Sequence, residues 1–123
     1  MKVLMLGGSE YLIQPLYVGD LARAVAASLD NPKTYGEIYC ISGPDTIRNR
    51  DYFTLLGELL GLPVEIRESD EEEYRSNHSD GYLYFLPRVY DLGKLREAGL
   101  PVPRVGLREG LKEQVEWLVE QGR

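Results

Sequence analysis

Apolar residues recur at steps of three and four in the first third of the chain, the spacing of one face of an α-helix. This set comprises Val18, Leu21, Ala22, Val25, Ala26 and Leu29. Asn31 and Pro32 follow it, and a residue before proline is pushed out of the helical region. The pattern predicts an amphipathic helix over residues 18–30, whose alanines allow close packing on a sheet.

Other stretches show the patterns of strands. The sequence EIYCISG holds a nearly continuous apolar run from Ile38 to Ile41, which is typical of a strand covered on both faces, with Cys40 as a small buried hydrophobe. Residues 64–67, VEIR, alternate between apolar and polar positions and predict a strand with one exposed face. The opening MKVLMLGG predicts a strand followed by a tight turn.

Three further helices are expected. Asn49 can serve as the N-cap of a helix that ends at Gly61, and Asp91 can cap a short helix that runs through Ala98 to Gly99. A last helix carries Trp117 beside an apolar stripe of Leu107, Leu111, Val115, Leu118 and Val119. Together these patterns predict an α/β fold, a small partial sheet with flanking helices, in which residues 1–123 form a single domain.

The charge balance narrows the classes of partner. The formal net charge is -6, and acidic residues are densest between Glu68 and Glu73. No basic stripe is present to neutralise a phosphate backbone, so we expect no nucleic-acid partner. No apolar run approaches the roughly 20 residues of a membrane span, and the apolar start is too short for a signal peptide. We therefore expect a cytoplasmic protein without a membrane partner.

The sequence contains too few cysteine and histidine residues for an internal disulfide or a zinc site. Cys40 is the only cysteine, so an internal disulfide is impossible and a reducing compartment is expected. His78 is the only histidine, and one residue of each type cannot supply the three or four ligands of a zinc site. The acidic run lacks the spaced pattern of a calcium loop. We expect no metal site.

The glycine pair in MKVLMLGG does not form a dinucleotide-binding loop. Such a loop needs G-x-G-x-x-G between a strand and a helix, and here Gly7 and Gly8 are adjacent with no third glycine. Pro15 falls inside the helix that would have to follow. Asp30, at a suitable distance for the ribose, falls at the end of a predicted helix. This chain is therefore expected to bind no cofactor of its own.

Three segments in order resemble the C-terminal part of the NAD(P)-dependent nucleotide-sugar epimerase/dehydratase family, within the extended or atypical short-chain dehydrogenases. They are GGSEYLIQPLYVGDLARAVAASLDNP, GEIYCISGPDTI and YDLGKLREAGLPVPRVGLREGLKEQVEWL. The resemblance implies the distal part of an extended Rossmann-type fold, the region that binds the substrate. It implies that the nucleotide-binding half, which holds NAD(P) in complete members, is absent.

The resemblance also marks residues of interest. Many family members carry an Arg-Asp pair ahead of the late strand, where the arginine reaches the sugar-nucleotide phosphates, but Ile13 and Gln14 stand at those positions here. Gln14, Tyr17 and Arg75 are the candidate remnants of a substrate-binding surface. Tyr17 faces the sugar-nucleotide pocket by resemblance, and Arg75 lies in a region that lines it.

No catalytic residue is expected in this chain. Tyr90 and Lys94 have the Tyr-x-x-x-Lys spacing of the family's acid/base pair, but their neighbours place them in its closing segment. We therefore expect Tyr90 to pack, Asp91 to cap a helix and Lys94 to be solvated. His78 and Asp80 are two residues apart in a polar loop, and the pattern indicates no nucleophile for them to activate, so we expect both to be solvated. The aromatic residues Tyr82, Tyr84 and Phe85 could stack on a base or sugar, but core or interface packing is the commoner role.

Two functions remain open. The chain is either the nucleotide-sugar-binding C-terminal portion of an epimerase/dehydratase-like protein, without turnover alone, or a free-standing, non-enzymatic binding or assembly module. The first predicts association with a separate nucleotide-binding chain. The second predicts a homodimer, because a strand that loses its neighbours leaves an open edge that proteins cover or pair.

Overall fold

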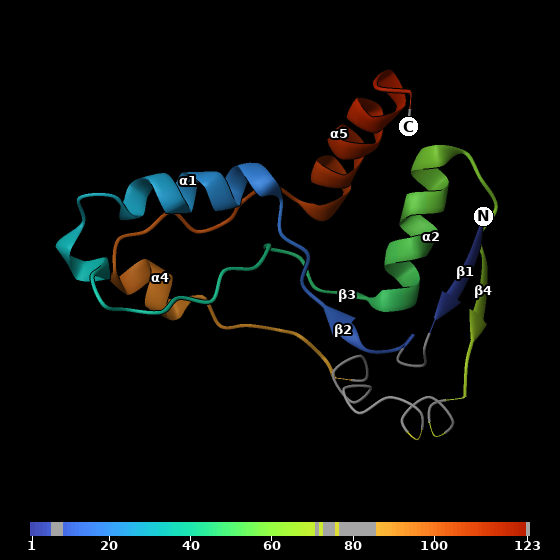
Figure 1. The fold of residues 1–123 in the computed structure, drawn as a ribbon, viewed down its shortest axis with the longest axis horizontal. Coiled ribbons are helices and arrows are strands. Elements are labelled where there is room, and N and C mark those ends of the chain that lie inside the picture. Colours follow the sequence, from blue (N-terminus) through green and yellow to red (C-terminus); the bar gives the residue numbers. More distant parts are fainter. Residues whose placement is uncertain (6–8, 71, 73–75, 77–85, 123) are drawn as a thin grey trace. The chain divides into compact units, whose positions relative to one another are not determined.

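The computed structural model describes residues 1–5, 9–70, 72, 76 and 86–122 (Figure 1). The chain divides into two compact units. One comprises Met1–Ile13 with Ile47–Arg88, and the other comprises Gln14–Thr46 with Val89–Arg123. Each unit is therefore built from two segments that are distant in the sequence, and each is described by itself below.

The first unit holds two short sheets. Strand β1 (Lys2–Met5) pairs in parallel with β4 (Glu65–Glu68), so that Lys2 lies opposite Glu65. Strand β2 (Leu12–Ile13) pairs antiparallel with β3 (Ile47–Arg48). The strand predicted from the alternation in residues 64–67 and the strand predicted for the opening are both confirmed. Gly7 and Gly8, on which the predicted turn rests, lie outside the described residues.

Helix α2 (Asn49–Leu60) follows β3 directly. It ends at Gly61, whose φ of 65° is a left-handed conformation that glycine adopts without a steric penalty, so the predicted helix end is confirmed. The predicted N-cap is wrong. Arg48 occupies that position without a side-chain cap, and Asn49 is the first helical residue. The N–H of Asn49 donates to the Tyr11 carbonyl, just ahead of β2.

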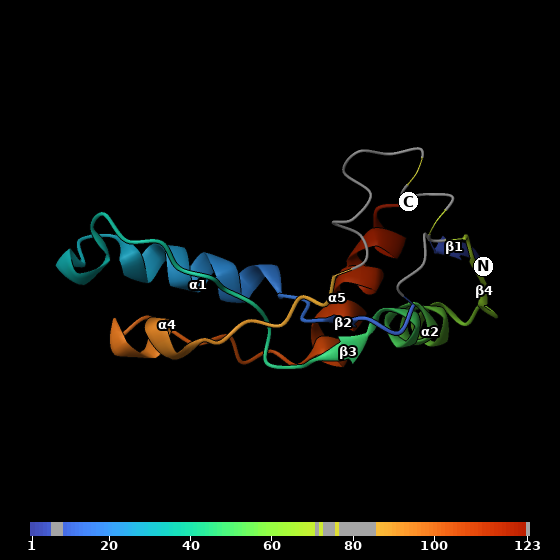
Figure 2. The same ribbon diagram turned by 90° about the horizontal axis from the view of Figure 1, so that it is seen from below.

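The second unit consists of helices and connecting segments. Its helices are α1 (Val18–Ser28), the short 3₁₀ helix η1 (Pro32–Thr34), α4 (Gly93–Glu97) and α5 (Leu107–Glu120) (Figures 1 and 2). Its core is formed by Leu92, Leu95, Ala98 and Leu100, against which Ala27, Tyr39, Ile41 and Val102 pack. The predicted last helix and the predicted short helix are both present. Leu92 and not Asp91 occupies the N-cap position of α4, but Asp91 Oδ1 accepts a hydrogen bond from the N–H of the first helical residue, Gly93, at 2.8 Å.

The apolar stripe predicted for α1 is not its buried face. Asp20 and Ala24 are the buried residues of this helix, whereas Val18 and Leu29 are 72% and 71% exposed. The helix itself is confirmed and ends two residues earlier than predicted. The orientation differs because Asp20 has hydrogen-bond partners inside the unit, and these turn the small-residue face inward.

The predicted buried strand at 38–41 is wrong. Residues 37–46 form neither helix nor strand, Ile38 is 85% exposed, and Cys40 is exposed rather than buried (Figure 1). No described residue forms a backbone–backbone hydrogen bond with residues 38–46. A strand needs such a neighbour, so the apolar sequence alone does not produce one.

The architecture is α/β, with short strands and flanking helices, as the sequence predicts. Among the helices of the described residues, none is long and apolar enough to cross a membrane.

Candidate functional site

Gln14 connects three segments of the second unit. Its Nε2 donates to the carbonyl of Gly43 at 2.8 Å, and its Oε1 accepts from the N–H of Tyr90, also at 2.8 Å. Both ends of the amide are therefore engaged with backbone. One amide hydrogen and one lone pair remain for a ligand. The position that the sequence marks as a candidate ligand residue also holds the fold together locally.

Tyr17 lies at the N-cap of α1 and contacts α5. Its hydroxyl donates to Glu113 Oε1 at 2.7 Å, and its ring covers Gly110, where an added Cβ would lie 3.0 Å from the ring. The hydrogen bond to Glu113 raises the pKa of Tyr17 above its ordinary value, because ionisation would place a second negative charge beside the carboxylate. The hydroxyl is thus a neutral hydrogen-bonding group and is not primed as a base.

Arg75, the third candidate, lies outside the described residues. The other loop candidates, His78, Asp80, Tyr82, Tyr84 and Phe85, lie outside them too, as do two residues of the acidic run, at positions 71 and 73. Of the predicted substrate-binding residues, the structure therefore describes Gln14 and Tyr17. Both belong to the segment that leads into α1.

Asp20 is the residue of this region that sequence reasoning missed. It is 2% exposed, and its Oδ2 accepts from the N–H groups of Arg104 at 3.1 Å and Val105 at 2.9 Å. Its Oδ1 accepts from Arg23 one turn along α1. A buried carboxylate needs such partners, and here they tie the start of α1 to the segment ahead of α5. Only the Val-x-Asp pattern at the helix start marks Asp20 in the sequence.

Asp45 makes a similar connection. Its Oδ2 accepts from the N–H of Leu107, the first residue of α5, at 2.6 Å. The first N–H groups of a helix lack intrahelical partners, and a carboxylate there also interacts favourably with the helix dipole. Asp45 thus caps a helix that begins 62 residues later in the chain.

Lys94 is paired and does not act on Tyr90. Its Nζ donates to Glu37 Oε2 at 2.6 Å and to the Ile38 carbonyl at 3.0 Å, and it lies 5.0 Å from the centre of the Tyr39 ring. Glu37 raises the pKa of Lys94, and Lys94 lowers the pKa of Glu37. Lys94 is exposed to solvent, as expected, and is also paired with Glu37. The expectation of a packed Tyr90 is wrong, because Tyr90 is 45% exposed.

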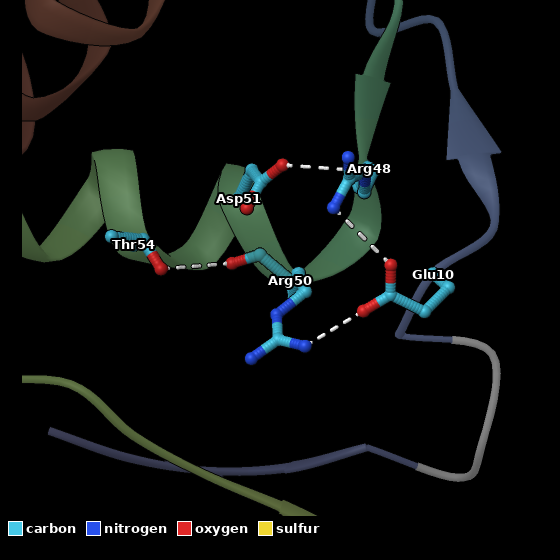
Figure 3. A network of polar contacts seen from close by, with 5 residues as sticks. All are labelled: Glu10, Arg48, Arg50, Asp51 and Thr54. Carbon is cyan, nitrogen blue, oxygen red and sulfur yellow. Dashed lines mark hydrogen bonds and ion pairs between the residues drawn. The ribbon is translucent and has the colours of Figure 1, made fainter.

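A charged cluster lies at the start of α2 in the first unit (Figure 3). Glu10 accepts from Arg50 at 2.7 Å and from Arg48 at 3.3 Å, and Arg48 also approaches Asp51 at 3.9 Å. The arginines lower the pKa of Glu10, and Glu10 raises the pKa of Arg50. All four side chains are about half exposed. The cluster joins the segment ahead of β2, through Glu10, to β3 and to the first turn of α2 (Figure 3). Both arginines are already paired with carboxylates of the cluster.

The described residues do not fit a dinucleotide cofactor. A Rossmann-type phosphate site needs a helix that starts at the glycine turn after the first strand. Here β1 is followed by β2, and the next helix begins at Val18. Within the described part of the chain, no group of three or more His, Cys, Asp or Glu side chains is arranged to hold a metal ion.

These elements define an α/β chain with the fold of a portion of the Rossmann-type epimerases and dehydratases. The chain is similar to UDP-glucose 4-epimerase from Thermotoga maritima, a structure solved with UDP-glucose, with a TM-score of 0.73 and 25% identity over 99% of this chain and 36% of that one. It is also similar to dTDP-glucose 4,6-dehydratase from Bacillus anthracis, solved with NAD, with a TM-score of 0.68 and 20% identity over 97% of this chain and 34% of that one.

The resemblance to the epimerase/dehydratase family that the sequence motifs predict is confirmed by these two structures. The chain spans about a third of the length of each of them. No protein-family model matches the sequence, and no curated protein matches it either.

Proposed function

We propose that this chain is the C-terminal, nucleotide-sugar-binding portion of an epimerase/dehydratase-like protein and has no turnover alone. The observation that carries the proposal is the match over 99% of the chain to the UDP-glucose 4-epimerase structure solved with UDP-glucose. In this proposal a nucleotide-binding chain supplies NAD(P), and the protein acts in the cytoplasm.

The candidate ligand residues are Gln14 and Tyr17 of the second unit, together with Arg75, which is a candidate from the sequence alone. The Tyr17 hydroxyl and the remaining amide groups of Gln14 suit the hydroxyl and carbonyl groups of a sugar or base, and Arg75 suits a phosphate. The pair Tyr90 and Lys94 has no catalytic role in this proposal. The hydrogen bonds of Lys94 Nζ go to Glu37 and to the Ile38 carbonyl.

The test is a titration of the purified chain with UDP-glucose, followed by NMR or calorimetry. Tyr17→Phe, Gln14→Ala and Arg75→Ala are expected to weaken binding several-fold. Tyr35→Phe is the matched control, since Tyr35 is an exposed tyrosine of the same unit. Incubation with UDP-glucose and NAD is expected to yield no UDP-galactose. Absence of binding would overturn the binding role, and steady turnover would overturn the non-catalytic one.

A second candidate function is a free-standing binding or assembly module that forms a homodimer. It is favoured by two observations in the second unit, namely the exposed apolar stripe of α1 and the unpaired segment 38–41. Exposed apolar surface of this kind marks interaction sites in soluble proteins. A module of this kind need not bind UDP-glucose, so the titration also separates the two candidates.

A further inference from the structure

The hydroxyl of Tyr17 has already given its proton to a neighbour. A phenol carries one O–H, and Tyr17 donates it to Glu113 Oε1 at 2.7 Å. Glu113 also raises the pKa of Tyr17, so the proton stays on the hydroxyl. Toward a ligand, the Tyr17 oxygen can therefore only accept a hydrogen bond. The ligand group that meets it must be a donor, such as a hydroxyl, and not a carbonyl or a phosphate oxygen.

Glu113 adds further acceptors at the same point. Its side chain is exposed, and a carboxylate accepts about four hydrogen bonds on its two oxygens, of which the contact with Tyr17 takes one. The Tyr17 hydroxyl and the Glu113 carboxylate thus present adjacent acceptors. Neighbouring hydroxyl groups of a sugar ring are adjacent donors and match them. The negative charge of Glu113 disfavours a phosphate at this point.

Two glycines keep the ring of Tyr17 in its place. An added Cβ at Gly19 in α1 would lie 2.5 Å from Cε1 of the ring, and one at Gly110 in α5 would lie 3.0 Å from Cδ2. Both distances are shorter than ordinary carbon–carbon contacts, so glycine leaves the room that the two edges of the ring need. A group that is fixed before the ligand arrives loses less conformational freedom on binding.

We propose that Tyr17 and Glu113 bind neighbouring hydroxyl groups of a sugar ring, and that both side chains act as acceptors. The inference rests on the nucleotide-sugar binding proposed above and adds Glu113 to the candidate ligand residues. Both residues belong to the second unit. A nucleotide sugar carries such hydroxyl groups on its hexose and on its ribose, and the experiment separates the two rings.

The experiment measures dissociation constants by calorimetry for three probes. They are UDP-glucose, UDP and the 2′,3′-dideoxy analogue of UDP, which has neither a hexose nor ribose hydroxyl groups. Tyr17→Phe and Glu113→Gln are each expected to weaken the binding of UDP-glucose at least about fivefold, because each removes or weakens an acceptor for the ligand. A loss with UDP-glucose alone assigns the hexose, and an equal loss with UDP assigns the ribose. Affinity for the dideoxy analogue is expected to stay unchanged.

Matched controls separate binding from folding. Glu116→Gln makes the same change at an exposed residue of α5, whose pair with Lys112 is 3.7 Å long, and should bind all three probes as the wild type does. Tyr35→Phe serves in the same way for Tyr17→Phe. Glutamine at position 113 still offers an oxygen to the Tyr17 hydroxyl, so a purely structural Glu113 predicts no change in affinity. Circular dichroism checks that the variants keep the fold.

The possible results distinguish the inference from the proposed function. Unchanged affinity for UDP-glucose in Tyr17→Phe or Glu113→Gln would overturn the inference alone. So would tighter binding by Glu113→Gln, the result expected of a carboxylate that faces a phosphate, an equal loss with the dideoxy analogue, or an equal loss in Glu116→Gln. Failure of the wild type to bind any of the three probes would overturn the proposed function together with the inference.

Discussion

Replacement of Asp20 tests whether a buried carboxylate holds the second unit together. Asp20→Ala removes the acceptor for the N–H groups of Arg104 and Val105 and leaves Arg23 without its partner. An unsatisfied buried donor costs about 1–3 kcal/mol, and these two donors are partly buried. We therefore expect the variant to lose about 2–4 kcal/mol of unfolding free energy, a large fraction of the ~5–15 kcal/mol typical of a protein.

Asp51→Ala is the matched control. Asp51 and Asp20 are both third residues of their helices, so both interact with a helix dipole in the same way. Asp51 is exposed, and its contact with Arg48 is 3.9 Å long. Its replacement is expected to cost under about 1 kcal/mol, the usual range for an exposed pair.

The assay is urea unfolding, followed by far-UV circular dichroism and by the fluorescence of Trp117, the only tryptophan. Trp117 lies in the same unit as Asp20. Hydrogen exchange of the Arg104 and Val105 amides adds a local measurement, and both amides are expected to exchange faster in Asp20→Ala. The reasoning is refuted if the two variants lose equal stability, or if these amides keep their wild-type protection.

Three further changes probe other contacts of the second unit. Gln14→Ala, which removes the bonds to Gly43 and Tyr90, is expected to cost about 1–2 kcal/mol in urea unfolding. Gly43→Ala places a Cβ 1.9 Å from the Pro15 carbonyl oxygen and is expected to cost about 1–3 kcal/mol or more in the same assay. Glu37→Gln is expected to lower the melting temperature at pH 7, and to lower it by less at pH 3. Lys94 holds the pKa of Glu37 below its ordinary 4.5, so the stabilisation is present above that pH and is lost as the pH falls through the lowered value.

Each of these three has a control in the chain. Gln121→Ala changes an exposed glutamine beyond α5 and should leave stability unchanged. Gly36→Ala meets no atom within 4 Å and should show only the smaller cost of its positive φ. Glu116→Gln breaks an exposed pair with Lys112 at 3.7 Å and should show little effect at either pH. An equal effect in a control and its partner would contradict the assigned contact.

Local patterns were sufficient to predict the helices. The apolar spacing in residues 107–119 predicts α5, and the glycine at position 61 predicts the end of α2. Both signals involve only residues that are close in the sequence. The segment 38–41 shows the limit of this reasoning. Its apolar composition is that of a covered strand, but a strand also requires hydrogen-bonding neighbours, and the described residues do not provide them.

The candidate site shows the same limit for polar residues. Gln14 and Tyr17 could be marked from motifs, but their partners Gly43, Tyr90 and Glu113 are 29, 76 and 96 residues away. The spacing of apolar residues in the helix could not show that Asp20 is buried, because its carboxylate accepts hydrogen bonds from N–H groups 84 and 85 residues later in the chain. Sequence periodicity carries no information about such pairs.

The carboxylates of Asp20 and Asp45 have a consequence for how the chain can be divided. They accept hydrogen bonds from the N–H groups of Arg104, Val105 and Leu107. The start of α5 is therefore held by residues of the first segment of the second unit, Gln14–Thr46. A proteolytic cut in the connector at 99–103 would therefore leave the α5 fragment bound as a non-covalent complex. The fragment 104–123 would then complement the rest of the chain. Its removal would do more than shorten the chain, because it would expose the buried carboxylate of Asp20 in α1.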